Sequence, residues 1–152
     1  MSARPDGPSA RRRPNARAVT RILLGAALAF AGLAHLTFAR EEFRAQVPRW
    51  VPIEEDTTVL ASGVVEIALG MTLASGWRKR MVGRAVAAFF VAVFPGNISQ
   101  WRNRRDGFGL DTDLKRLLRL PFQIPLVAGA LWSTAEPPSP GTRTSHGGFE
   151  GR

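Results

Sequence analysis

Four long, nearly uncharged apolar segments constrain this chain more than any other feature. They cover residues 22–38, 57–77, 85–101 and 120–135, and Glu66 is the one charged residue among them. A helix needs roughly 17 to 25 residues to cross ~30 Å of hydrocarbon, so the fourth segment, with 16 residues, is marginal. Four such segments in 152 residues leave no amphipathic helices for the outer shell of a soluble protein. The sequence therefore predicts an all-α fold, an integral membrane four-helix bundle.

We expect the spans at about 20–39, 57–77, 83–101 and 118–135, within a membrane domain of residues 18–135. The flanking segments 1–17 and 136–152 are rich in Arg, Pro and Gly and predict disordered tails. The first segment also resembles a secretory signal, with its Arg-rich leader. Its apolar run is longer than a signal core and three more segments follow, so we expect an uncleaved helix.

The basic residues predict an orientation rather than a nucleic-acid surface. A net charge of +9 and a pI near 11.7 first suggest nucleic acid, but the charges lie in the tails and loops between uncharged runs. Twelve Lys and Arg residues lie in the two tails and the second loop, against nine in the first and third loops. This bias predicts a multi-pass protein of the bacterial cytoplasmic (inner) membrane with both termini inside.

Glu66 lies near the middle of the second apolar segment. A carboxylate there costs about 2.5 to 3.5 kcal/mol, and seven strongly apolar neighbours return about 0.3 to 0.6 kcal/mol each, so the two sums nearly cancel. Ser62, Gly63, Glu66 and Gly70 share one helix face, which should turn inward. Two interpretations stay open: a packing face whose Glu bonds a neighbouring helix, or a ligand or proton site.

Three further polar residues should lie near Glu66. With alternating helix directions, His35, Asn97 and Gln123 fall ~5 to 6 Å below the surface that carries the first and third loops, and Glu66 falls ~14 Å below it. This clustering predicts a polar-lined pocket between the helices, open toward those loops.

Proline and tryptophan residues surround the predicted pocket. Pro95 leaves the carbonyl of Val91 without its usual donor, and Asn97 or a water should complete the bonding. In the first loop, Pro48 and Pro52 bracket a stiff turn whose Trp50 could cover the pocket. In the third loop, residues 113–119 predict a short interfacial helix with Thr112 as its N-cap.

This chain lacks the residues that several kinds of chemistry require. There is no cysteine for a disulfide, thiolate or iron–sulfur ligand, and one intramembrane histidine cannot supply two axial haem ligands. No catalytic triad, phosphate-binding glycine loop or carboxylate pair is evident. We therefore expect no metal and no intrinsic catalytic activity.

Five short motifs occur in order along the chain: GLAH at 32–35, VPRWVP at 47–52, SGVVE at 62–66, VFPGN at 93–97 and RLPFQ at 119–123. Together they resemble the DoxX family of small bacterial membrane proteins, over about residues 20–134. The resemblance implies a four-helix membrane bundle whose signature positions are His35, Pro48, Pro52, Gly63, Glu66, Pro95, Asn97, Arg119, Pro121 and Gln123. Members of that family are linked to quinone-dependent sulfur oxidation and to membrane complexes that handle oxidative stress. This chain departs from a redox role of its own because it lacks cysteine.

The leading functional expectation is an accessory subunit of a membrane redox system, with redox partner subunits in the same lipid bilayer. A quinone-like or other small amphipathic ligand would bind at His35, Glu66, Asn97, Arg119 and Gln123. His35 and Gln123 would donate to a ligand carbonyl, and Glu66 would exchange a proton. Pro48, Trp50, Pro52, Gly63, Pro95 and Pro121 would have structural roles.

Two other classes of function stay open. One is a non-catalytic assembly factor or scaffold that binds partner helices through Gly25, Ala29 and Gly32 or through the 63–70 face. The other is a small-solute transporter, which would need a homo-oligomer because four helices alone enclose little space.

Overall fold

The computed structural model describes residues 15–107 and 109–136, and every regular element in this part of the chain is helical. The elements are α1 (Ala16–Leu36), α2 (Arg40–Arg44), α3 (Glu55–Ser75), α4 (Lys79–Arg102), α5 (Asp113–Arg119), the 3-10 helix η1 (Leu120–Phe122) and α6 (Gln123–Thr134). The predicted disordered tails lie outside the described residues, except for 15–17 and 136. Residues 16 and 17 already belong to α1, because Asn15 caps that helix by accepting from the Arg17 amide at 3.1 Å.

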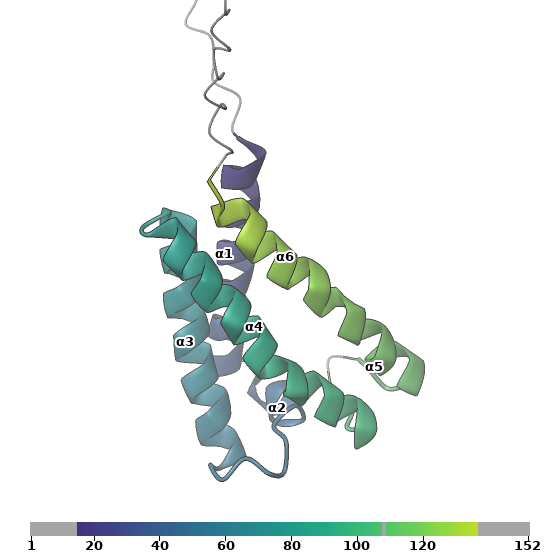
Figure 1. The fold of residues 1–152 in the computed structure, drawn as a ribbon. Helices are drawn as coiled ribbons and strands as arrows, with labels where there is room; N and C mark the ends of the chain where they lie inside the picture. Colours follow the sequence, from purple (N-terminus) through teal and green to yellow (C-terminus); the bar gives the residue numbers. More distant parts are fainter. Residues whose placement is uncertain (1–14, 108, 137–152) are drawn as a thin grey trace, which may run out of the picture.

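The long helices pack in antiparallel pairs (Figure 1). Helix α1 packs along α3, α4 along α6, and further contacts join α1 to α6 and α3 to α4. The short helices α2 and α5 both lie at the end opposite the start of α1 and the end of α6. The first and third loops therefore share one end of the molecule, as predicted, and we call this the loop end.

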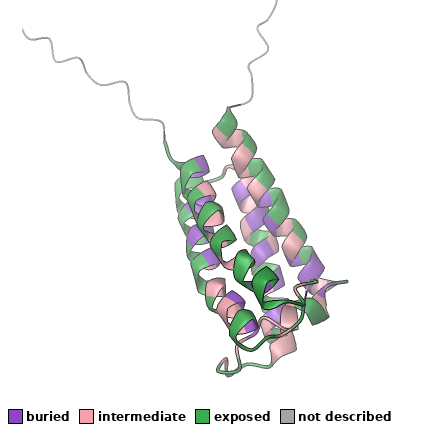
Figure 2. Ribbon diagram, turned by 90° about the vertical axis from the view of Figure 1, so that its right-hand side faces the viewer, coloured by how far each residue is buried: buried purple, intermediate pink, exposed green. Residues whose placement is uncertain are grey.

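Three helices, α1, α3 and α4, are long and apolar enough to cross a membrane. Their apolar stretches are only 28%, 28% and 39% buried inside the protein, so most of these side chains face outward. Figure 2 shows this as exposed residues along the outer faces of the helices. A soluble helix of this composition would bury its apolar face instead.

The fourth apolar segment is not one continuous helix, and the expected span of 118–135 is divided. The expected span comprises the end of α5, the turn η1, and α6, whose 12 residues reach ~18 Å. Pro121 lacks an N–H and lies in η1, while Pro125 is the third residue of α6, where a missing N–H costs nothing. The two prolines thus end one helix and begin the next.

Two glycine pairs bring α1 and α3 into backbone contact. A Cβ added at Gly70 would lie 2.5 Å from the Gly25 carbonyl oxygen, and one at Gly32 would lie 2.5 Å from that of Gly63. The glycines of each pair therefore permit the close approach. These are the two faces that the scaffold alternative assigned to partner helices, and within the chain they pack against each other.

The half of the molecule near the termini has an apolar interior. Its core contains Leu28, Leu73, Val82, Val86, Ala87, Phe90 and Ala130. Thr72 and Ser75 donate to backbone carbonyls of their own helix at 2.6 Å and 2.8 Å. Ser133 and Thr134 do the same in α6. The polar contacts between side chains of different helices, His35 with Glu66 and Asn97 with Gln123, lie toward the loop end.

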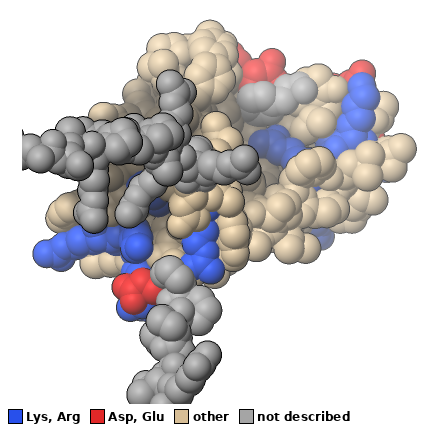
Figure 3. Space-filling model, turned by 90° about the horizontal axis from the view of Figure 1, so that it is seen from above, with Lys and Arg blue, Asp and Glu red and all other residues tan. Residues whose placement is uncertain are grey.

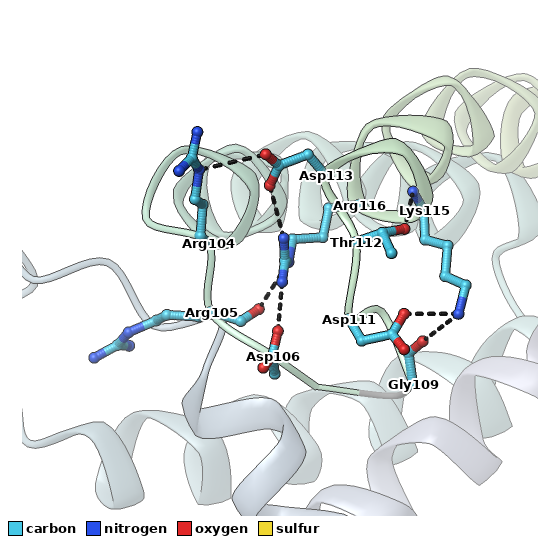
Figure 4. A network of polar contacts seen from close by, with 9 residues as sticks. All are labelled: Arg104, Arg105, Asp106, Gly109, Asp111, Thr112, Asp113, Lys115 and Arg116. Carbon is cyan, nitrogen blue, oxygen red and sulfur yellow. Dashed lines mark hydrogen bonds and ion pairs between the residues drawn. The ribbon is translucent and has the colours of Figure 1, made fainter.

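The predicted helix at 113–119 and its cap are confirmed, and a buried arginine fixes them in place. Thr112 Oγ1 accepts from the Lys115 amide at 3.3 Å. Arg116 donates to the Arg105 carbonyl at 3.3 Å and pairs with Asp113 at 2.8 Å and with Asp106 (Figure 4). The hydrogen bond from the Lys115 side chain to Asp111 lowers the pKa of the Asp111 carboxyl.

Arg105 joins the third loop to the first. Its Nη1 donates to the backbone carbonyls of Arg44 and Val47, each at 3.2 Å, and its Nη2 pairs with Glu55 at 3.0 Å. Because these contacts bridge residues about fifty to sixty positions apart, the two loops form one cover over the loop end.

Candidate functional site

A pocket of about 350 Å³ lies between α1, α3, α4 and α6 near the loop end. All five residues predicted to bind a ligand line it: His35, Glu66, Asn97, Arg119 and Gln123. Its walls are largely apolar and include Leu28, Val59, Phe89, Phe90, Val93 and Leu126. The structure therefore brings the predicted residues together around one cavity.

His35 and Glu66 form the most buried polar contact of the pocket. His35 Nδ1 lies 3.0 Å from Glu66 Oε2, and each residue is only 6% exposed. The predicted difference of ~8 Å in depth is wrong for their side chains. Each side chain leans toward the N-terminus of its own helix, and α1 and α3 are antiparallel, so the two groups approach each other.

The hydrogen bonds define the state of the histidine ring. His35 Nδ1 lies 2.7 Å from the carbonyl oxygen of Ala31, which can only accept, so Nδ1 carries the proton. In the neutral ring Nε2 is then an acceptor. Phe43 stacks on the imidazole with ring centroids 3.3 Å apart and fixes its plane.

The Glu66 carboxylate has capacity for another donor. Ser62 Oγ donates to Oε1 at a long 3.5 Å, while the buried Oε2 has no hydrogen-bond partner among the described residues. A buried carboxylate oxygen without a donor costs about 1 to 3 kcal/mol or more. A donor from a bound molecule or a proton would remove that cost.

Two side-chain amides link α4 to α6 near Pro95. Asn97 Nδ2 donates to Gln123 Oε1 at 3.5 Å, and Gln123 Nε2 donates to the carbonyl of Phe90. The carbonyl that loses its helical donor because of Pro95 is that of Val91, and Phe90 lies one residue before it. The expectation that Asn97 or a water completes the bonding of the Val91 carbonyl therefore stays a prediction.

Arg119 lies between two glutamines that the sequence did not single out. Its Nη1 donates to Gln100 Oε1 at 3.2 Å and its Nη2 to Gln46 Oε1 at 3.4 Å. Gln100 is fully buried, and Gln46 reaches the pocket because its backbone carbonyl rests against Gly96, where a Cβ would lie 2.8 Å away. The position of Gln100 at the end of an uncharged run could have identified it from the sequence as a buried polar residue. No feature of the sequence around Gln46 indicates that it reaches the pocket.

The predicted structural residues have different positions. Pro48, Trp50 and Pro95 line the pocket, and Trp50 is 73% exposed at its rim. Pro52 is exposed outside the pocket, Gly63 lies in the α1–α3 contact, and Pro121 lies in η1.

This arrangement has the properties of a site for a small amphipathic molecule. Apolar walls, amide donors, a guanidinium and a carboxylate–imidazole pair surround a cavity at the small end of the range for ligand pockets. Within residues 15–107 and 109–136 there is no group of three metal-ligating side chains. Binding would thus depend on hydrogen bonds and apolar contact.

The pocket coincides with the part of the chain that comparison recognises. No curated protein and no solved structure matches this chain. A family described as a domain of unknown function (DUF8561) matches residues 24–134, which is close to three quarters of the sequence and contains every residue that lines the pocket. The chain belongs to the DUF8561 family.

Proposed function

We propose that this protein is a four-helix bundle of the bacterial inner membrane that holds a small, quinone-like amphipathic ligand as an accessory subunit of a redox system. The observation that carries the proposal is the buried Glu66–His35 contact in an otherwise largely apolar pocket. The resemblance of the five sequence motifs to the DoxX family agrees with it, and the redox partner subunits stay a prediction of that resemblance.

The outward apolar surface supports the membrane part of the proposal. Large apolar side chains such as Leu23, Val64 and Met71 are 59% to 65% exposed. Val64 lies in the middle of α3, and Leu23 and Met71 lie nearer the end of the molecule where α1 begins. Together η1 and α6 supply 15 residues, or ~22 Å, for the fourth crossing. Leu114, Leu117 and Leu118 are exposed on α5 and would rest in the interface.

The charges of the loops support both termini on the cytoplasmic side. The segment 77–84, which joins α3 to α4, contains four basic residues and no acidic one. Together with the two tails, the end that carries the termini has twelve Lys and Arg residues, against nine in residues 40–56 and 102–119 at the loop end. The positive-inside rule, which counts Lys and Arg, therefore favours the cytoplasm for the end that carries the termini.

The hydrogen-bonding groups favour a ligand that presents both carbonyl and hydroxyl oxygens. Asn97 and Gln123 each use one amide N–H in the contacts described above and retain a second for a ligand carbonyl. His35 donates to Ala31, so the neutral ring offers Nε2 as an acceptor for a ligand hydroxyl rather than as the donor first expected. Glu66 beside it would take up or release one of the two protons that accompany the two electrons exchanged between quinone and quinol, and the proposed redox partner subunits would supply or accept those electrons.

Titration of the purified protein with a short-chain ubiquinone analogue tests the proposal. We expect Glu66→Gln and His35→Ala each to weaken binding about tenfold, since hydrogen bonds to charged groups are worth about 1.5 to 3 kcal/mol. Thr72→Ala is the matched control, because Thr72 bonds only its own helix on the same element as Glu66. Binding that is equal in all four proteins would remove these residues from the role.

A further inference from the structure

A second pocket, of about 300 Å³, lies at the opposite end of the molecule from the first. It is formed where α1 begins, where α3 turns into α4 and where α6 ends. Its polar lining includes Asn15, Arg17, Arg21, Ser75, Lys79 and Ser133. Figure 3, which looks onto this end, shows basic side chains gathered there.

The lining of this pocket is cationic and contains no carboxylate. Arg17, Arg21 and Lys79 supply three positive charges, and no described carboxylate forms an ion pair with any of them. The nearby Glu136 pairs instead with Arg80, which is outside the lining. Three like charges around one small volume repel one another unless an anion lies between them.

Backbone carbonyls hold the two arginines in position. Arg21 Nη1 donates to the carbonyls of Leu73 and Ala74 at 2.8 Å and 2.9 Å, and Arg17 Nη1 donates to that of Ala135 at 2.8 Å. A guanidinium has five N–H donors, so each arginine retains donors for a ligand. Gly76, with φ of +78°, makes room for Arg21, because a Cβ there would collide with the guanidinium.

The surroundings of the pocket match the headgroup level of a bilayer. Trp77 and Trp132 flank it, and the guanidinium of Arg17 lies 5.5 Å from the Trp132 ring centroid. Exposed apolar side chains follow directly toward the middle of the molecule, among them Ile22 and Leu23. A cation cluster above an apolar surface, with tryptophan at the boundary, is the arrangement that accommodates both a phosphate and its acyl chains.

We propose that this pocket binds the phosphodiester headgroup of an anionic phospholipid in the leaflet that faces the termini. The inference goes beyond the proposed function, since it concerns the other end of the protein and rests only on the membrane part of that proposal. A dissolved phosphate ion shares the chemistry, but the adjoining apolar surface favours the lipid.

Native mass spectrometry of the full-length protein in detergent tests the site. The protein is titrated with phosphatidylglycerol and, separately, with phosphatidylcholine of the same acyl chains. We expect phosphatidylglycerol to bind at least fivefold more tightly. Lys79→Gln should weaken its binding about fivefold, the effect of one basic residue near a lipid phosphate. Lys79 is exposed and makes no side-chain hydrogen bond or ion pair with another described residue, so we expect the change to leave the fold intact.

Arg84→Gln is the matched control, because it removes the same charge from α4 outside the pocket and should leave binding unchanged. Equal binding of the two lipids, or equal effects of Lys79→Gln and Arg84→Gln, would overturn the site. Displacement of the lipid by millimolar inorganic phosphate would reassign the pocket to a soluble anion and overturn the lipid assignment. Glu66→Gln, which tests the other pocket, should leave phosphatidylglycerol binding intact, so either proposal can fail alone.

Discussion

At the scale of single residues, the pocket depends on polar groups whose partners come from other helices. Glu66 meets His35 across the α1–α3 contact, and Gln123 of α6 donates to the Phe90 carbonyl of α4. Each of these groups would be costly in hydrocarbon if its partner were lost. The polar residues of the pocket therefore serve the fold as well as any ligand, and the two roles need separate tests.

Gln123→Met tests the structural role. The variant keeps the volume of the side chain but removes the hydrogen bond from α6 to the Phe90 carbonyl of α4, so we expect a loss of about 0.5 to 1.5 kcal/mol in the free energy of unfolding. Denaturation in detergent micelles measures this loss, with exposed Ile124→Met as the control. Equal stability of the two variants would contradict a stabilising bond between the two helices.

At the scale of helices, close backbone approach replaces large apolar side chains at the α1–α3 contact. The buried faces carry Gly25, Gly32, Gly63 and Gly70 together with Leu28, Val59 and Leu73, while many of the large apolar residues of both helices point outward. This inversion is expected where lipid is as apolar as leucine and helices associate by close packing. The glycine pairs also bring Glu66 within reach of His35, so the contact positions the pocket.

A single added methyl group tests that contact. Gly70→Ala would put Cβ 2.5 Å from a carbonyl oxygen and 2.6 Å from the Ala29 nitrogen, and neither backbone atom can move aside cheaply. We expect a loss of about 1 to 3 kcal/mol, the usual cost of overpacking. Gly129→Ala is the matched control in α6, where the new Cβ would meet only a leucine methyl at 3.9 Å. Equal stability of the two variants would contradict the close approach.

Features that depend on local composition could be predicted from the sequence, and features that depend on the lateral order of helices could not. The three long helices and the Thr112-capped helix follow from apolar runs and a capping residue. The shared pocket followed from depth along antiparallel helices. The side chain that bonds the Phe90 carbonyl could not be predicted, because its identity depends on which helix packs beside α4. Phe43 and Gln46 were missed because the path of the first loop, and not its composition, brings them to the pocket.

At the scale of the whole molecule, the two ends differ in kind. The loop end covers a polar pocket and holds nearly balanced charges, while the other end has an apolar interior below a cationic pocket. Between them the outer surface is apolar along α1, α3 and α4. This distribution agrees with the proposed membrane bundle, in which the middle of the protein would lie in hydrocarbon and the two ends would face different aqueous surfaces.

The most direct test of the account is the accessibility of spin labels in liposomes, and the chain has no native cysteine to interfere. Labels at Val64→Cys and Val91→Cys, which are 59% and 60% exposed, should collide with lipid-dissolved oxygen and not with a water-soluble nickel chelate. A label at the loop position Arg49→Cys should show the reverse, and one at buried Ala87→Cys should meet neither reagent. Strong collision of the nickel chelate with the labels at 64 and 91 would show that water surrounds these helices and would contradict the membrane bundle.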